Sequence, residues 1–240
     1  MAQEGHRYAE FESRKYDPLR PQYHEGVKTM KGMGYTWDDF LEHFPAFIGH
    51  FGLARLLTLY ELYKQTLEVS GHIAEMGVYK GSGSLLFGKL VRLFEPSSMT
   101  MVHGFDWFEG MATTDEEKYV DSGSYTEKYE RVLQLVKAQG MDNVVKIHKV
   151  DATKDLVPFF EEHAYMQFKL VFLDAGIYEV TKASIEAFWP RITPGGILIL
   201  DQYNHELSPG ETRAVRDVLP NAKVRTLPFG WMPTAYIVKE

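Results

Sequence analysis

From residue 51 onward, short apolar runs alternate with longer segments in which apolar residues recur at every third or fourth position. The short runs predict β-strands, and the longer periodic segments predict amphipathic helices. The predicted strands span residues 72–76, 99–105, 144–150, 169–173, 197–200, 223–227 and 234–238. The predicted helices span residues 51–67, 84–94, 125–139, 156–163, 181–189 and 209–219.

Local signals mark the ends of two of these helices. Ser124 and Glu127 have the spacing of a capping box, which predicts a helix start near residue 125. Ser208 and Glu211 repeat that spacing, with Pro209 at the first helical position. The helix at 51–67 is expected to bury one apolar stripe. Its members are Leu53, Leu56, Leu57, Tyr60, Tyr63 and Leu67.

The first 45 residues show little periodicity beyond a predicted short helix at 37–43. We therefore expect an N-terminal extension or cap over residues 1–45 and a single domain over residues 46–240. Strands that alternate with helices form right-handed βαβ units, so this domain is predicted to be α/β, with a doubly wound, mostly parallel seven-stranded sheet. The last two strands follow one another directly, which predicts an antiparallel last strand. Ligands of such sheets bind at the carboxyl ends of the strands.

The composition of the chain limits which partners and which kinds of site it can have. The net charge of −7 disfavours nucleic acid as a partner, because a phosphate backbone requires a basic surface. Cysteine is absent, which excludes disulfides, thiolate metal sites and thiol nucleophiles. Residues 1–16 are polar, and the apolar runs are too short to cross a bilayer, so we expect no membrane partner and a soluble, cytoplasmic protein.

A glycine-rich turn follows the first predicted strand. Gly77, Gly81 and Gly83 have the order G-x-x-x-G-x-G, whereas a dinucleotide fold prefers G-x-G-x-x-G. Glu75 precedes the turn; its carboxylate would repel a pyrophosphate but suits a cationic amino group, such as the methionine end of S-adenosylmethionine. The alternative interpretation is a turn without a ligand.

Two further strands end at acids. The carboxylate of Asp106 can accept hydrogen bonds from both hydroxyls of a ribose, or it can cap a turn. The carboxylate of Asp151, before Ala152, can meet an adenine edge, or it can cap the next helix. Taken together with Glu75 and the glycines, Asp106 favours a nucleoside ligand.

The stretches AEMGVYKG at residues 74–81 and FDWFEG at residues 105–110 resemble the macrocin-type (TylF-like) O-methyltransferases. These are class I enzymes that methylate sugar hydroxyls in natural-product pathways. The stretch LDAGIYE at residues 173–179, with PGG at 194–196 and Asp201, is similar to their downstream half. The resemblance covers residues 44–219.

The resemblance implies a class I methyltransferase (Rossmann-like) fold with strand order 3-2-1-4-5-7-6. It also implies S-adenosylmethionine as the cofactor and a sugar or glycoside as the methyl acceptor. The cofactor contacts that it implies are Phe47, Ile48, Glu75, Gly77, Tyr79, Ser82, Gly83, Ser84, Asp106, Trp107, Asp151, Ala152 and Asp174.

Asp174 and Asp201 end two successive predicted strands. If these strands are neighbours, at about 4.8 Å separation, the two carboxylates could share one hard cation such as Mg²⁺. The related enzymes bind magnesium at these places with an additional acid, where this chain has Gln202. Gly176 stands where relatives can carry a catalytic aspartate, and glycine has no side chain for proton transfer.

Three interpretations of the chemical site stay open. The first is a weakened metal site of Asp174, Asp201 and Gln202, the second is metal-free catalysis by a nearby base, and the third is lost activity. Asp174 and His205 are the candidate catalytic residues. His205 is the candidate substitute base, because histidine titrates near neutrality; a surface-loop histidine is the alternative. The charged stretch at residues 113–118 is either a solvated loop or a lid over the acceptor.

The leading hypothesis is an S-adenosylmethionine-dependent O-methyltransferase that acts on a hydroxyl of a sugar or related small molecule. One alternative is a cofactor-binding protein with weak or lost activity. Another is a nicotinamide-dependent oxidoreductase, which shares the fold class but needs the other glycine order. Self-association through the Phe- and Tyr-rich first segment is left open.

Overall fold

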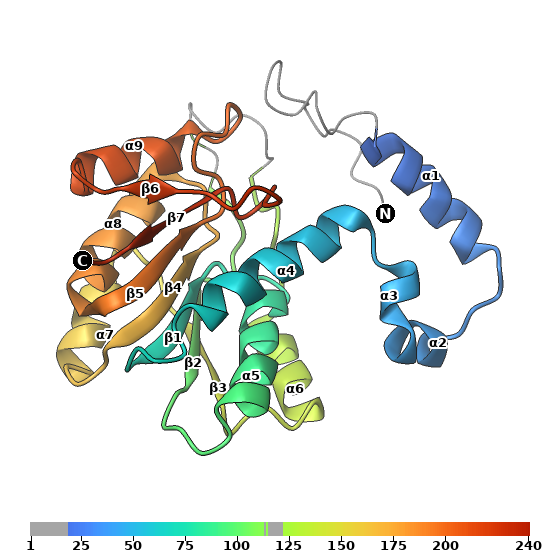
Figure 1. The fold of residues 1–240 in the computed structure, drawn as a ribbon, viewed down its shortest axis with the longest axis horizontal. Helices are drawn as coiled ribbons and strands as arrows, with labels where there is room; N and C mark the ends of the chain where they lie inside the picture. The colour runs from blue at the N-terminus through green and yellow to red at the C-terminus, as the bar shows by residue number, and fades with distance from the viewer. Residues whose placement is uncertain (1–18, 113, 115–121) are drawn as a thin grey trace.

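A seven-stranded sheet forms the centre of the molecule in the computed structural model (Figure 1), which describes residues 19–112, 114 and 122–240. The strand order is β3-β2-β1-β4-β5-β7-β6. β1 to β5 pair in parallel, and β7 pairs antiparallel with both β5 and β6. The strands are β1 (His72–Met76), β2 (Val102–Asp106), β3 (Val145–Lys149), β4 (Phe168–Leu173), β5 (Ile192–Leu200), β6 (Val224–Arg225) and β7 (Ala235–Val238). The predicted fold class and the antiparallel last strand are thereby confirmed.

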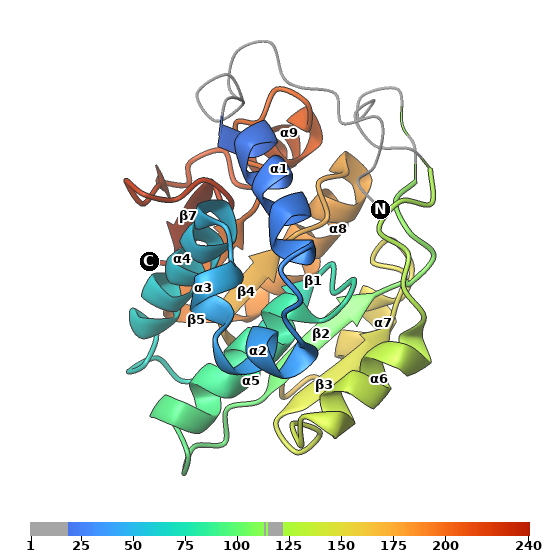
Figure 2. The same ribbon diagram turned by 90° about the vertical axis from the view of Figure 1, so that its right-hand side faces the viewer.

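Helices cover both faces of this sheet (Figures 1 and 2). One face carries α4 (His50–Lys64), α5 (Ser82–Phe94) and α6 (Tyr129–Ala138). The other face carries α7 (Leu156–Glu162), α8 (Tyr178–Phe188) and α9 (Pro209–Val218), with a short 3₁₀ turn, Trp189–Arg191, after α8.

The strand sequences explain the two apolar cores. Successive side chains of a strand point to opposite faces of the sheet. In β4, Leu170 and Phe172 pack against the α4–α6 layer, whereas Val171 and Leu173 pack against the α7–α9 layer. Because both faces are covered, the central strands are apolar at nearly every position, which is the pattern that identified them.

An N-terminal arm precedes α4 and projects from the sheet domain (Figure 1). It contains α1 (Leu19–Lys31), α2 (Trp37–Glu42) and α3 (Phe44–Phe47). The sequence predicted α2, whose start is a capping box between Thr36 and Asp39, but it did not predict α1. The arm exposes Trp37 and Leu41 to 79% and 71%. The domain boundary at residue 45 and self-association through this segment stay predictions.

One helix begins later than predicted, and a second begins as predicted but without the predicted capping bond. α6 begins at Tyr129 rather than near residue 125, because Tyr125 has φ +59°, a left-handed conformation outside the helical region. α9 begins at Pro209 as predicted, yet Ser208 makes no capping bond. Its hydroxyl donates instead to the Gly176 carbonyl at 3.0 Å, and Glu211 accepts from the Gln202 amide.

The buried stripe of α4 was predicted correctly at Tyr63 but wrongly at Leu53 and Leu57. Leu53 and Leu57 are exposed, whereas Leu59 and Leu62 are buried together with Tyr63. The face of α4 that meets the sheet therefore differs from the predicted one, and the Arg55 side chain reaches the carboxylates at the strand ends. Among the described residues, no helix combines the length and the apolar character needed to cross a bilayer.

Candidate active site

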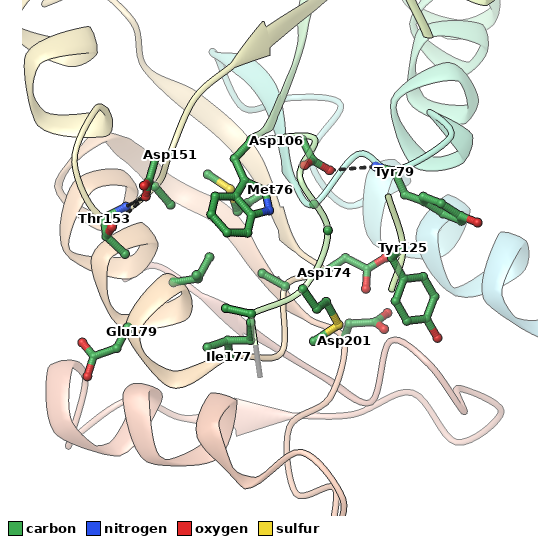
Figure 3. Close-up of a pocket in the computed structure, with 18 of the residues that line it drawn as sticks. Met76, Tyr79, Asp106, Tyr125, Asp151, Thr153, Asp174, Ile177, Glu179 and Asp201 are labelled. Atoms are coloured by element: carbon green, nitrogen blue, oxygen red, sulfur yellow. Dashed lines mark hydrogen bonds between the residues drawn. The ribbon is translucent and has the colours of Figure 1, made fainter. Parts of the chain in front are cut away.

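Two cavities lie at the carboxyl ends of the parallel strands, where the fold class predicts a ligand. The larger, of about 560 Å³, is bordered by the ends of β1 to β5 (Figure 3). The smaller, of about 260 Å³, lies between α4, β1 and the start of α5. Both are bordered by Arg55, Gly77, Tyr79 and Asp174, so the two spaces meet at these residues.

Glu75 borders the smaller cavity and is only 2% exposed. Its carboxylate accepts from the Ser84 amide at 2.6 Å and from the Ser84 hydroxyl, at the first turn of α5. A helix N-terminus stabilises negative charge through its free N–H groups. Gly83 permits this approach, since an added Cβ there would lie 2.0 Å from the Glu75 Oε1 atom. Burial nevertheless raises the pKa of Glu75 to about 8.

Asp106 ends β2 and borders the larger cavity. Its carboxylate accepts from the backbone amide of Tyr79 at 2.9 Å (Figure 3) and from that of Phe108 at 2.7 Å. These bonds fix the glycine turn against the end of β2, although Tyr79 has φ +49°. Burial raises the pKa of Asp106. Each carboxylate oxygen retains a further lone pair for a ligand hydroxyl.

The far end of the larger cavity is bordered by Trp107, Asp151 and Ala152. The Asp151 carboxylate accepts from the Thr153 amide at 3.0 Å and pairs with Lys154 at 2.6 Å. It therefore holds the turn before α7 and also borders the cavity, but it does not cap that helix, whose N-cap residue is Asp155.

The three predicted metal ligands lie together. β4 and β5 are neighbours with Leu173 opposite Leu200, which places Asp174 beside Asp201 (Figure 3). The Gln202 side-chain amide donates to Asp201 at 2.8 Å and lies 3.5 Å from Asp174. The Arg55 guanidinium, however, spans both carboxylates, because it donates to Asp174 at 2.6 Å and also donates to Asp201.

The electrostatics of this cluster are dominated by burial and by Arg55. Burial raises the pKa of Asp201, and the guanidinium acts against that effect. Burial alone lowers the pKa of Arg55, but the two facing carboxylates more than offset it, so its pKa lies above the ordinary value. Burial also raises the pKa of Glu211, whose Oε1 accepts from the backbone N–H of Gln202 at 2.8 Å.

Asp174, Asp201 and Gln202, as the structure arranges them, do not fit a divalent cation. Both oxygens of Asp174 and both of Asp201 face an N–H group of Arg55 or Gln202. A hard cation needs several oxygen ligands arranged around it, and here the positively charged Arg55 guanidinium already bridges the two carboxylates that would share the ion. Gln202 turns its donor toward the carboxylates, while its Oε1 is buried and has no partner among the described residues.

The remaining predicted site residues divide into those that border a cavity and those that do not. Phe47 packs in the arm, with its ring 4.4 Å from that of Phe40, and neither Phe47 nor Ile48 borders either cavity. His205 follows β5 but borders neither cavity. Ser82 borders the smaller cavity. Ser84 does not border it but donates a hydrogen bond to Glu75, which does.

The sequence missed several side chains that border the larger cavity. These are Arg55, Met76, Met111, Ala112, Tyr125, Ile177 and Met232, while Thr114, from the stretch predicted as a possible lid, borders it as well. Part of the loop predicted as a lid is thus beside the cavity, whereas residues 113 and 115–121 lie outside the described residues. A single arginine among the apolar positions of α4 was the only signal for Arg55.

Comparison with known proteins identifies the family. A model of the macrocin O-methyltransferase (TylF) family matches residues 28–227. The chain belongs to this family. The resemblance seen in the motifs at residues 74–81, 105–110 and 173–179 is therefore confirmed, and the nicotinamide alternative is set aside.

One curated relative is the 8-demethyl-8-(2,3-dimethoxy-alpha-L-rhamnosyl)-tetracenomycin-C 4'-O-methyltransferase of Streptomyces olivaceus. It is 28% identical over 160 residues, which are 63% of this chain and 61% of that relative. The match therefore spans about 61% of the relative's length.

Several solved structures share the fold of this chain. CalS11, a calicheamicin methyltransferase, has a TM-score of 0.80 at 24% identity over 95% of this chain and 93% of that chain. Its apo form, described as a TDP-rhamnose 3'-O-methyltransferase, has a TM-score of 0.74 at 26% identity over 92% and 94% of the two chains. The O-methyltransferase NovP has a TM-score of 0.65 at 19% identity over 78% and 80%.

Proposed function

We propose that this protein transfers the methyl group of S-adenosylmethionine to a ring hydroxyl of a sugar related to rhamnose. The observation that carries the proposal is the position of Glu75. A carboxylate that is 2% exposed, held at the N-terminus of α5 and bordering a cavity, is suited to a cationic ammonium group. Family membership and the sugar-directed relatives support the same function.

The joined cavities offer each part of the cofactor a matching group. Glu75 receives the ammonium group, and Asp106 accepts hydrogen bonds from the ribose hydroxyls. Trp107 and Ala152 border the adenine end beside Asp151. Bound there, the cofactor supplies an electrophilic methyl group on a sulfonium centre.

Asp174 lies where the two cavities meet, with 28% of its side chain exposed. It is the group that holds the acceptor hydroxyl and takes its proton. With the cofactor bound, the acceptor hydroxyl would pass its proton to Asp174 while its oxygen takes the methyl group from sulfur, and S-adenosylhomocysteine would be released. Alignment of the three atoms in line is the main contribution of the site.

The test uses the purified protein with S-adenosylmethionine and two acceptors, TDP-rhamnose and a rhamnosylated aglycone. Mass spectrometry should detect one added methylene on one of them, and the two arms separate a nucleotide-linked from an aglycone-linked acceptor. Asp174→Asn should lower kcat by about 10²–10⁴-fold while S-adenosylhomocysteine still binds. Failure to bind either form of the cofactor would overturn the proposal.

Gly176 and Gln202 favour one alternative, a cofactor-binding protein with weak or lost activity. That protein would bind S-adenosylhomocysteine but would transfer no methyl group to any sugar acceptor, with or without added magnesium. A positive transfer assay with either acceptor excludes it.

A further inference from the structure

We infer that Arg55 takes the place of a divalent cation at the acceptor end of the site and that the protein needs no metal. The inference deepens the proposed methyl transfer and rests on it for its catalytic meaning. Its structural content, which cation holds Asp174 and Asp201, is tested independently of any acceptor.

The first argument is the occupation of the carboxylates. Asp201 has a side chain that is only 3% exposed, and its two oxygens are taken by Arg55 and by the Gln202 amide. Asp174 faces the same two donors. A metal ion could bridge this pair only after the Arg55 guanidinium, which already bridges it, had moved away.

The second argument is the way the fold holds Arg55. It lies on α4, a fifteen-residue helix whose buried face packs on the sheet. Its guanidinium carbon is 5.2 Å from the ring centroid of Phe172, a fully buried residue of β4. A planar guanidinium can bond two carboxylates at once and also face an aromatic ring, which a lysine ammonium does less well.

The third argument is charge. Two carboxylates and one guanidinium leave one net negative charge at the junction of the cavities. That charge suits a neighbouring sulfonium and an acceptor hydroxyl. A divalent ion added beside Arg55 would reverse its sign, and Gln202 supplies no negative charge to restore it.

Arg55 is therefore a positioning residue: it holds Asp174 in the orientation needed to meet the hydroxyl. The structure gives each side chain of the cluster a defined part. Asp201 anchors the guanidinium from its buried side, and Gln202 bonds the oxygens that Arg55 leaves free.

Metal binding tests the inference directly. Wild-type protein should show the same unfolding midpoint in EDTA and in excess Mg²⁺, and Mn²⁺ monitored by EPR should remain free. Arg55→Met should unfold at a lower temperature. It should also bind Mn²⁺ with a Kd about a hundredfold below the lower limit measured for wild type, because a positive charge near the ion is removed. Mg²⁺ should then raise its midpoint. Arg216→Met, an exposed change on α9, is the matched control.

Two further variants keep the test decisive if Arg55→Met does not fold. Arg55→Lys retains the charge and should stay insensitive to metal. Gln202→Asp adds a carboxylate but keeps Arg55, so it should still leave Mn²⁺ free. Binding of Mn²⁺ by wild type, loss of wild-type turnover in EDTA, or Mn²⁺ binding by Gln202→Asp would each overturn the inference. Absent methyl transfer with unchanged metal insensitivity would instead count against the proposed function alone.

Discussion

Glu75→Gln should separate folding from cofactor binding, because the buried carboxylate is unfavourable for the first and essential for the second. The substitution keeps the shape of the side chain and one acceptor for the Ser84 amide, which lies 2.6 Å from the carboxylate. It removes the charge that would meet the ammonium group. We expect a more stable protein with a weaker affinity for S-adenosylhomocysteine.

The stability change follows from the pKa. Burial raises the pKa of Glu75 from 4.5 to about 8, so the folded protein binds more protons than the unfolded chain between these values. Stability therefore falls as the pH rises through this range. Ionisation of Glu75 in the unfolded chain lowers the free energy of unfolding by about 2 kcal/mol at pH 6 and by about 4 kcal/mol at pH 8. The advantage of Glu75→Gln over wild type should widen by about 2 kcal/mol between those two pH values.

The binding change follows from the lost charge. A hydrogen bond to a charged group contributes about 1.5–3 kcal/mol, so the Kd for S-adenosylhomocysteine should rise by about tenfold to a hundredfold. Urea unfolding at pH 6 and pH 8 and calorimetric titration measure the two effects, with the exposed Glu68→Gln as control. Unchanged affinity would show that Glu75 does not receive the ammonium group. A stability difference independent of pH would show that Glu75 is already ionised at pH 6.

Three other substitutions test the framework around the site. Gly83→Ala places a Cβ 2.0 Å from Glu75 Oε1, so calorimetry should detect loss of S-adenosylhomocysteine binding and urea unfolding a loss of about 1–3 kcal/mol. Glu95→Gln leaves the ammonium of Lys169, 0% exposed and 2.6 Å from Glu95, without its counter-charge, so unfolding should cost about 3–5 kcal/mol less. Burial lowers the pKa of His103 to about 3, so wild type should lose about 3 kcal/mol from this residue between pH 6.5 and pH 4, and His103→Leu should flatten that limb of the stability curve.

Exposed positions provide the controls. Gly26→Ala in α1 meets no atom within 4 Å and should leave binding unchanged. Glu68→Gln and His24→Leu change exposed side chains and should leave the urea midpoint and its pH dependence as in wild type. Retained cofactor binding in Gly83→Ala, a Glu95→Gln protein as stable as wild type, or an unaltered acid limb in His103→Leu would contradict the corresponding argument.

The order of strands and helices could be predicted because it depends on local periodicity. Strands buried on both faces are continuous apolar runs, and the helices between them show one apolar face. Glu75, Asp106, Asp174 and Asp201 could be singled out for the same reason, since parallel strands bring their carboxyl ends to one edge of a sheet whatever the details of packing.

The tertiary structure alone decided what those carboxylates meet. Asp174 and Asp201 were predicted to share a metal ion because they end neighbouring strands and because the family resemblance implies magnesium at these places. Their partner is Arg55, which lies 119 and 146 positions away and reaches them only because α4 packs on a face other than the one predicted. Local periodicity does not determine which face of a helix meets the sheet, so the charge at the centre of the site became visible only in the folded chain.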